Sequence, residues 1–351
     1  MRGARDRRAV EDRLFERLAR GQLLVLVGAG ASRWAGLPSW REAVTALAQD
    51  LVPALRARVP NARERFRPPA PDERVPIETL LRIPEVYRHL FGEARLVERL
   101  GELFDTSRID AADLPLQQLL VRLSPFLPAI YTTNFDDLVE RTFAWAGIPC
   151  QVVAAAEDLQ DWKLDDVEGA WVPRFPVYKL HGTLGRPGSL VIGESDVLRR
   201  SDLATHPIDL RFCSDVMGRQ LLLIGYGFAD PNVRWIWTKL RDLEVAPLGW
   251  FVELGTSTDL DRAAMEAERM LRIDLESDDP RHPPELLDFL GSLVERCERE
   301  LGRRIALAWP GAGAPPGLLH GAHGEARDEA VEEDVVHDRG RDGRDEARRH
   351  E

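Results

Sequence analysis

The sequence has only three cysteines in 351 residues, and no C-x-x-C pair. Cys150, Cys213 and Cys297 lie far apart in the chain, so their spacing fits neither a structural zinc site nor a disulfide framework. We therefore predict no metal site, and the low cysteine content fits a reducing cytoplasm.

Long apolar runs and an excess of positive charge are also missing. The longest apolar run, residues 23–31, is interrupted by glycines and is far too short to cross a bilayer. The arginines near the start resemble the beginning of a signal peptide, but a charged helical pattern follows, so we expect a cytoplasmic protein. The net charge of −12 argues against a generic nucleic-acid binder, although a local basic patch is compatible with that total.

The apolar pattern that is present predicts an α/β fold. Helical spacing occurs at residues 9–20 and 40–51, and again at 136–145, 232–243 and 284–301. Strand-like runs occur at residues 23–27, 126–132, 151–154, 177–180, 190–192, 221–225, 250–254 and 271–275. Strands that alternate with helices indicate a doubly wound, mostly parallel Rossmann-type sheet.

Two segments depart from this alternation. Residues 52–122 contain three helical patterns, at 77–90, 94–104 and 114–123, and we interpret them as a helical insertion within one domain of residues 1–305. Residues 306–351 are rich in glycine, alanine and proline and then almost entirely charged, which predicts a disordered tail. The tail holds four of the eight histidines, and their irregular spacing favours a solvated tail over a metal site.

A glycine-rich turn, Gly-Ala-Gly-Ala-Ser at 28–32, directly follows the first strand. Gly28 and Gly30 allow a tight turn in which backbone N–H groups approach a diphosphate. The dehydrogenase fingerprint needs a third glycine where Arg33 stands, and Asp50 lies on the following helix instead of ending a second strand. By itself this motif is equally compatible with a strand–helix turn that binds nothing.

A second turn, Gly-Leu-Pro-Ser-Trp-Arg at 36–41, comes immediately afterwards and suggests a flap over the phosphate site. Pro38 and Ser39 suit the start of the next helix. We expect Trp40 to be a core anchor more than a stacking partner for a ligand.

Two further strands end in candidate catalytic groups. Thr-Thr-Asn-Phe-Asp at 132–136 lies where doubly wound sheets bind ligands. Asn134 or Asp136 could instead cap the next helix, and both roles are compatible if Asp136 caps and Asn134 faces the pocket. His181 is the one histidine outside the tail at a strand–glycine junction, which suits a general base, whereas Lys179 is expected at the surface or in an ion pair.

The later strands end in a similar way. Gly-Tyr-Gly-Phe-Ala-Asp-Pro-Asn at 225–232 is another glycine-rich turn, with Asp230 or Asn232 available to cap a helix. Glu253 ends the following strand and is a candidate for binding an adenosine ribose hydroxyl.

In this order the motifs resemble the sirtuin family. Segments 28–32 and 36–41 are similar to the sirtuin Gly-Ala-Gly-x-Ser and Gly-Ile-Pro-Asp-Phe-Arg sequences, and 132–136 to Thr-Gln-Asn-Ile-Asp. Lys-Leu-His-Gly at 179–182 resembles the stretch that holds the catalytic histidine. Segment 225–232 has the form found in bacterial sirtuin-like NADases of anti-phage defence, and the resemblance spans roughly residues 21–275.

The resemblance implies NAD as substrate and Asn134 and His181 as catalytic residues, with Asn134 orienting water or ribose hydroxyls and His181 accepting a proton through a ribose hydroxyl. It implies cofactor contacts from Gly28, Ala29, Gly30, Ser32, Arg41, Thr133, Asp136, Gly225, Gly227, Asp230 and Glu253. The chain lacks the zinc module of sirtuin deacylases, and Ser39 replaces the aspartate of Pro-Asp-Phe-Arg, near the nicotinamide.

The implied function is an NAD glycohydrolase that releases nicotinamide and ADP-ribose, in anti-phage defence by NAD depletion. The alternatives are an NAD-dependent deacylase or ADP-ribosyltransferase, and a non-catalytic protein that senses NAD or ADP-ribose. We further expect a homo-oligomer, a separate sensor or ATPase partner, and no direct contact with membranes or nucleic acids.

Overall fold

The structure is a computed structural model. It describes residues 2–61, 65–70, 73, 75–167, 170–200, 206–226, 231–242, 244, 248–254, 258–275, 277–279 and 282–302. The predicted tail, 306–351, and the predicted contacts Gly227 and Asp230 lie outside the described residues.

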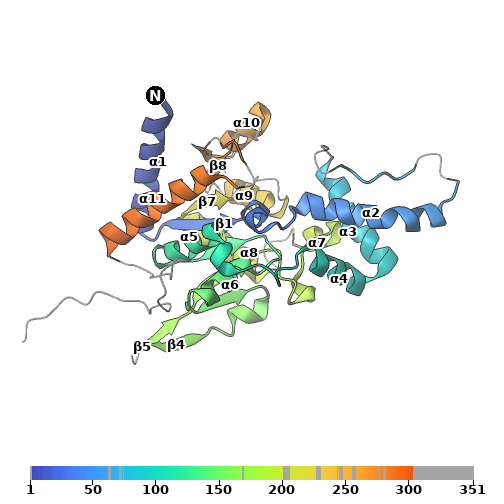
Figure 1. Ribbon diagram of the computed structural model, residues 1–351, viewed down its shortest axis with the longest axis horizontal. Helices are drawn as coiled ribbons and strands as arrows, with labels where there is room; N and C mark the ends of the chain where they lie inside the picture. The colour runs from blue at the N-terminus through green and yellow to red at the C-terminus, as the bar shows by residue number, and fades with distance from the viewer. Residues whose placement is uncertain are drawn as a thin grey trace, which may run out of the picture. The chain divides into compact units, whose positions relative to one another are not determined.

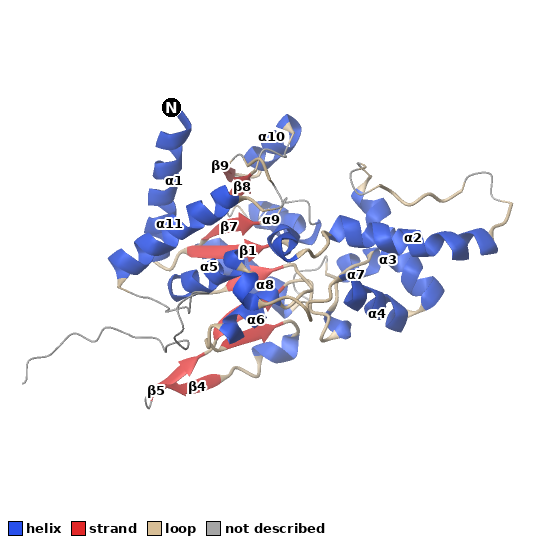
Figure 2. Ribbon diagram, viewed as in Figure 1, coloured by secondary structure: helices blue, strands red, loops and turns tan. Residues whose placement is uncertain are grey.

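A parallel seven-stranded sheet forms the centre of the fold, in the order β3-β6-β2-β1-β7-β8-β9 (Figure 2). The chain moves from β1 to β2 on one side and later returns to β7 on the other, so the order reverses beside β1. This confirms the doubly wound fold. The strands are β1 (Leu23–Val27), β2 (Ile130–Thr132), β3 (Cys150–Val153), β6 (Phe175–Lys179), β7 (Gln220–Ile224), β8 (Gly249–Glu253) and β9 (Met270–Asp274).

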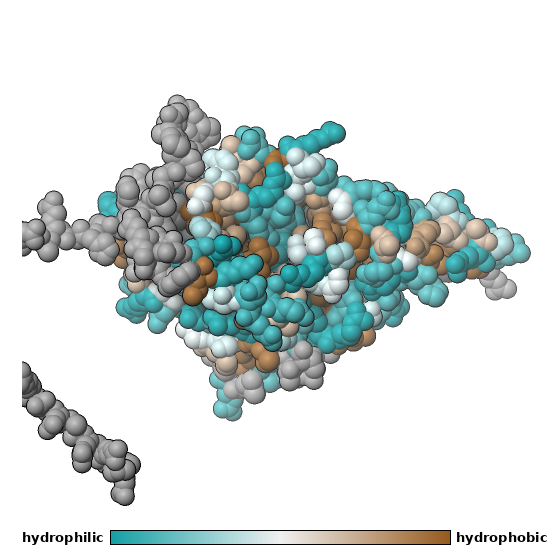
Figure 3. Space-filling model, turned by 90° about the horizontal axis from the view of Figure 1, so that it is seen from below, coloured by the Kyte–Doolittle hydropathy of each residue, from teal (hydrophilic) through white to brown (hydrophobic). Residues whose placement is uncertain are grey.

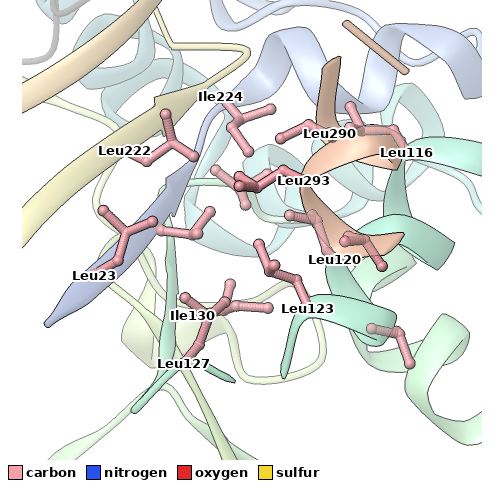
Figure 4. Packing of buried hydrophobic residues seen from close by; sticks show 14 of the residues in the cluster. Leu23, Leu116, Leu120, Leu123, Leu127, Ile130, Leu222, Ile224, Leu290 and Leu293 are labelled. Atoms are coloured by element: carbon pink, nitrogen blue, oxygen red, sulfur yellow. The ribbon is translucent and has the colours of Figure 1, made fainter. Parts of the chain in front are cut away.

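Helices cover both faces of the sheet (Figure 1). Alternate residues of β1 point to opposite faces: Leu23 belongs to one apolar cluster and Leu24 to the other. The first cluster contains residues of α1 (Arg2–Ala19), α5 (Pro115–Leu123), α6 (Leu138–Trp145) and α11 (Pro284–Leu301) (Figure 4). The second contains residues of α8 (Pro207–Gly218), α9 (Pro231–Asp242) and α10 (Asp259–Ala267). Since strands buried on both faces have no polar side, they appear in the sequence as continuous apolar runs.

Two helices of the predicted insertion, at 77–90 and 94–104, share an apolar cluster with the helix before them, whereas the third, at 114–123, belongs to the first cluster on the sheet. Leu80 on α3 and Leu47 on α2 are fully buried in the shared cluster, and Phe135 and Ile192 join it from the sheet domain. The helices are α2 (Trp40–Arg58), α3 (Ile77–Phe91) and α4 (Glu93–Leu103), and α7 (Glu194–Arg199) contacts α3. The remaining elements are η1 (Ala29–Ala35), η2 (Ala111–Asp113), η3 (Ser124–Phe126), η4 (Ala156–Leu159), η5 (Pro187–Ser189) and the hairpin β4 (Leu164–Val167) with β5 (Ala170–Pro173).

Two of the expected strands differ from the prediction. Residues 190–192 form a buried loop that packs into the insertion cluster, so their apolar character reflects burial and not a strand. In the run 126–132 the strand begins only at Ile130, because Pro125 lies in the short helix η3.

The outer surface is mainly hydrophilic in the view of Figure 3, where apolar residues form separate small groups. Among the helices that the structure describes, none is both long and apolar enough to span a membrane.

Candidate active site

The turns that follow β1 and β7 touch each other where the strand order reverses. Gly30 N–H donates to Gly225 O at 2.8 Å. A Cβ on Gly28 would lie 2.6 Å from Gly225 O, and one on Gly225, whose φ is +62°, would lie 2.3 Å from Ala31 N. Glycine is therefore required because the two backbones are in contact, at the edge where such sheets bind ligands.

Asn134 follows β2 and is fixed by three hydrogen bonds. Its Nδ2 donates to Gly28 O at 3.2 Å and to Ser32 Oγ at 2.9 Å, while its backbone N–H donates to Thr132 Oγ1 at 3.0 Å. Since a carbonyl oxygen only accepts, the amino group of Asn134 must face Gly28. This orientation leaves Asn134 Oδ1 as a buried acceptor that has no partner among the described residues.

Asp136 continues this chain of hydrogen bonds. Ser32 Oγ accepts from Asn134 and donates to Asp136 Oδ2 at 2.8 Å, and Asp136 Oδ1 accepts from the N–H of Leu138 at the start of α6. Burial raises the pKa of Asp136, although the Lys179 charge and the Ser32 hydrogen bond oppose the rise. Asp136 therefore both orients Ser32 and holds the first turn of α6.

Lys179, the last residue of β6, is fully buried. Its Nζ donates to Asp136 O and lies 2.7 Å from Glu140 Oε1. The expected ion pair is confirmed, with Glu140 as the partner. The alternative of a surface position is wrong, because the side chain is buried and its ammonium group donates to the main chain of Asp136.

His181 comes two residues after β6 and lines the same cavity as Asn134. Gly182 next to it has a φ of +77°, and a Cβ there would lie 2.1 Å from Ser189 O. The chain can reverse direction at this point only with glycine. Further along, Val191 N–H donates back to His181 O at 3.1 Å. The main chain of His181 is thus fixed at the cavity rim.

The cavity between these groups has a volume of about 400 Å³, within the range of small-molecule sites. Of the predicted contact residues, it brings together Ala29, Gly30, Ser32, Arg41, Thr133, Asp136 and Gly225 with Asn134 and His181. Convergent polar groups at the carboxyl edge of the sheet, with an apolar end formed by the insertion, suit a ligand that has both a polar and a flat apolar part.

Comparison with protein families gives a match for residues 128–272, to the family described as SIR2-like domain. This segment of the chain is similar to a SIR2-like domain. The matched segment contains Asn134 and His181, and the glycine turn at 28–32 precedes it in the sequence.

Two curated relatives extend the likeness beyond this segment. The chain is 24% identical over 230 residues to the NAD(+) hydrolase ThsA of Acinetobacter baumannii, covering 66% of this chain and 41% of the relative. It is 25% identical over 229 residues to Defense-associated sirtuin 2 of Bacillus subtilis, covering 64% of this chain and 20% of the relative. The chain thus spans less than half the length of these relatives.

Solved sirtuin structures align along most of this chain. A Sir2 homolog–NAD complex aligns over 83% of this chain and 94% of its own, at 15% identity and a TM-score of 0.35. A structure titled for the mechanism and regulation of Sir2 enzymes aligns over 83% of this chain and 98% of its own, at 13% identity and a TM-score of 0.38.

Glu253 and Arg41 have contacts that were not expected, whereas Ser39 lies at the start of the next helix as predicted. Glu253 is 1% exposed, lies 3.4 Å from Arg262 and does not line the cavity, so a ribose contact there stays a prediction. Arg41 lines the cavity, but its Nη1 donates to Glu73 O at 2.8 Å. Ser39 accepts from Glu42 N–H at 3.2 Å and so begins α2 with a capping box.

Sequence reasoning missed Arg33 and the apolar wall of the cavity. Arg33 lines the cavity and forms two hydrogen bonds with Glu42, of 2.9 and 3.1 Å. Burial raises the pKa of Glu42, but hydrogen bonds from Ser39 and Arg33 outweigh it and hold the pKa below its usual value. The only signal for Arg33 was its position where a dehydrogenase has glycine. The wall residues gave no signal, because residues such as Leu81 resemble any other core position.

Proposed function

We propose that this SIR2-like chain is an NAD glycohydrolase, which cleaves the bond between nicotinamide and ribose and releases ADP-ribose. The observation that carries the proposal is the buried Asn134 Oδ1, an acceptor without a partner among the described residues, on a side chain that lines the same cavity as His181 at the carboxyl edge of the sheet. The names of two relatives, both NAD(+) hydrolase ThsA, support the same reaction.

In the proposed reaction, water attacks the ribose carbon as the bond to nicotinamide breaks. Nicotinamide is a cationic substituent that leaves as a neutral molecule, so the site need not protonate it. The requirement is to stabilise positive charge on ribose and to orient the water. Asn134 Oδ1 accepts a hydrogen bond from the water or from a ribose hydroxyl, and His181 takes up the proton that is released. The glycine turns bind the diphosphate through backbone N–H groups.

We propose a role for this cleavage in anti-phage defence through NAD depletion. The name of the Bacillus subtilis relative, Defense-associated sirtuin 2, supports a defence role. Assembly into homo-oligomers and activation by a separate sensor or ATPase are further proposals, since the match covers only 41% and 20% of the length of these relatives.

Nicotinamide release from NAD by the purified protein tests the reaction. We expect release by the wild type and a loss of at least ~100-fold for Asn134→Ala and for His181→Ala, the scale of removing one acid–base group. The matched controls are Asn61→Ala and His89→Ala, because both side chains are exposed and lie outside the cavity. Equal release by the wild type and the Asn134→Ala, His181→Ala double variant would refute the proposal.

A further inference from the structure

Helix α3 of the insertion is joined to α7 by a set of polar contacts that we call the Arg88 clamp. It consists of Glu85 and Arg88 on α3 with Ser195 and Asp196 on α7. Arg88 Nη2 lies 2.9 Å from Asp196 Oδ2, and Ser195 Oγ donates to Glu85 Oε2 at 2.8 Å. Asp196 is only 4% exposed, so this ion pair is largely screened from water and should hold the two helices together more firmly than a surface pair.

The Arg88 clamp also fixes the segment of Val191 and Ile192, which forms one wall of the cavity. Asp196 Oδ2 accepts from Ile192 N–H at 3.1 Å and from Gly193 N–H at 2.9 Å. The N–H of Val191, the residue before Ile192, donates a hydrogen bond to His181 O. The wall is therefore attached to His181 at one end and to Arg88, through Asp196, at the other.

Close packing leaves this wall little freedom to move. Val191 and Ile192 are 6% and 2% exposed, and both line the cavity together with Val197 of α7. A Cβ on Gly193 would lie 2.7 Å from Glu85 Oε2, so the clamp sits directly against the main chain here.

The wall adjoins the main chain of His181, and both line the same cavity. A general base must be within hydrogen-bond reach of the proton that it accepts, so the acceptor of the ribosyl group has to enter beside His181. Val191, Ile192 and Val197 line the cavity that His181 also lines, and their side chains are apolar. The position of the wall thus limits how large an acceptor can be.

We propose that the Arg88 clamp fixes this wall at a distance that admits water and excludes larger acceptors, which makes Arg88 a specificity-determining residue. The inference rests on the proposed function, since it concerns the acceptor in the same reaction. In each case the bond from ribose to nicotinamide breaks, the acceptor oxygen bonds to the same carbon, and its proton passes to His181. Water gives ADP-ribose, and propanol would give the propyl glycoside of ADP-ribose.

Binding and product analysis on wild type and Arg88→Met test this. We expect the wild type to bind the propyl glycoside about tenfold more weakly than ADP-ribose, and Arg88→Met to remove most of that difference, as for a misfit of one or two methylene groups. With NAD and propanol together, the ratio of propyl glycoside to ADP-ribose should rise about tenfold in Arg88→Met. This product ratio does not depend on how much of the variant is folded.

Arg82→Met is the matched control, because Arg82 and Glu194 join the same two helices through an exposed pair of 3.4 Å. Gly193→Ala is the second variant; it displaces Glu85 without removing a charge and should give an intermediate ratio. An unchanged ratio and affinity difference in Arg88→Met and Gly193→Ala would overturn the inference, as would an equal change in Arg82→Met. A wild type that cleaves NAD but fails these tests leaves the proposed function intact, whereas a wild type that neither binds ADP-ribose nor releases nicotinamide would overturn both.

Discussion

At the scale of single residues, the proposed chemistry depends on which edge of the Asn134 amide faces the cavity. Ser32 determines this together with Gly28, because its hydroxyl accepts from Asn134 Nδ2 and donates to Asp136. Ser32, which also lines the cavity, can therefore influence the proposed reaction through Asn134.

Replacing Ser32 by alanine should mainly lower kcat. Without the hydroxyl, Asn134 loses one of two Nδ2 partners and can rotate, and we expect a decrease in kcat of about 10- to 100-fold with a smaller change in KM. Steady-state nicotinamide release measures this. Ser124→Ala is the control, since Ser124 is also buried but bonds to Val121 O away from the cavity. A change in KM alone would show that Ser32 acts only in binding.

His206 gives a prediction for stability in acid. Burial lowers the pKa of its imidazole, the nearby Arg200 charge lowers it further, and Asp209 opposes both. Below the ordinary histidine pKa of about 6.5, the unfolded chain binds a proton that the folded protein does not. The free energy of unfolding should therefore decrease as the pH falls through this value towards the folded pKa.

Urea unfolding of wild type and His206→Gln at about pH 7.5 and about pH 5.5 measures this effect. The variant should lose less stability than the wild type, and His89→Gln, at an exposed position, should behave like the wild type. Equal losses in wild type and His206→Gln would contradict the assignment.

Single residues were predictable where they end a buried strand. Asn134 and His181 stood out because polar groups at the carboxyl ends of parallel strands meet at one edge. The clamp residues Arg88 and Asp196 could not be identified this way. They are 108 positions apart, and nothing local distinguishes them from the many other charged residues of the chain.

At the scale of elements, the contact between the β1 and β7 turns should be sensitive to any side chain. Gly225→Ala introduces both a left-handed backbone strain and a Cβ 2.3 Å from Ala31 N. We expect a loss of more than ~2 kcal/mol in the free energy of unfolding, together with weaker binding of ADP-ribose.

Gly21→Ala separates the effect of backbone strain from the effect of the Cβ contact. Gly21 has nearly the same φ, +63°, but nothing lies within 4 Å of the position that a Cβ would take there, so only the backbone strain of about 1 kcal/mol applies. Chemical unfolding of both variants tests the comparison. Equal losses would mean that the turns can move apart and do not depend on each other.

The buried contact between β6 and α6 gives another prediction. Lys179→Met leaves Glu140 without its partner and Asp136 O without its donor, and we expect a loss of about 3–5 kcal/mol. Lys179→Met with Glu140→Leu should recover part of this loss, because no uncompensated carboxylate remains. Denaturant unfolding measures both. A double variant no more stable than the single one would show that the bond to Asp136 O dominates.

Elements were predictable where apolar spacing was long and regular, as in α3 and α11. Short helices such as α7 were missed, since six residues show too little periodicity. The loop 190–192 was mistaken for a strand because an apolar triplet packs equally well against helices, and only the tertiary contact with the insertion distinguishes the two.

At the scale of the molecule, the doubly wound fold and a helical insertion followed from the alternation of patterns along the chain. The sequence did not predict how the insertion packs on the sheet domain. Leu81 and Val191 are far apart in the chain, and only the folded structure shows that they line the same cavity. The sequence therefore predicted the polar residues at the carboxyl edge of the cavity better than the residues of its apolar wall.

The central claim is that Asn134 and His181 face one NAD molecule in this cavity. A crystal structure of the His181→Ala variant with NAD tests it most directly, because the variant should bind NAD and cleave it slowly. We predict the diphosphate against the 28–32 turn and Gly225, with Asn134 Oδ1 hydrogen-bonded to a ribose hydroxyl or to a water beside the ribose. NAD bound elsewhere, or a ribose out of reach of Asn134, would contradict the account.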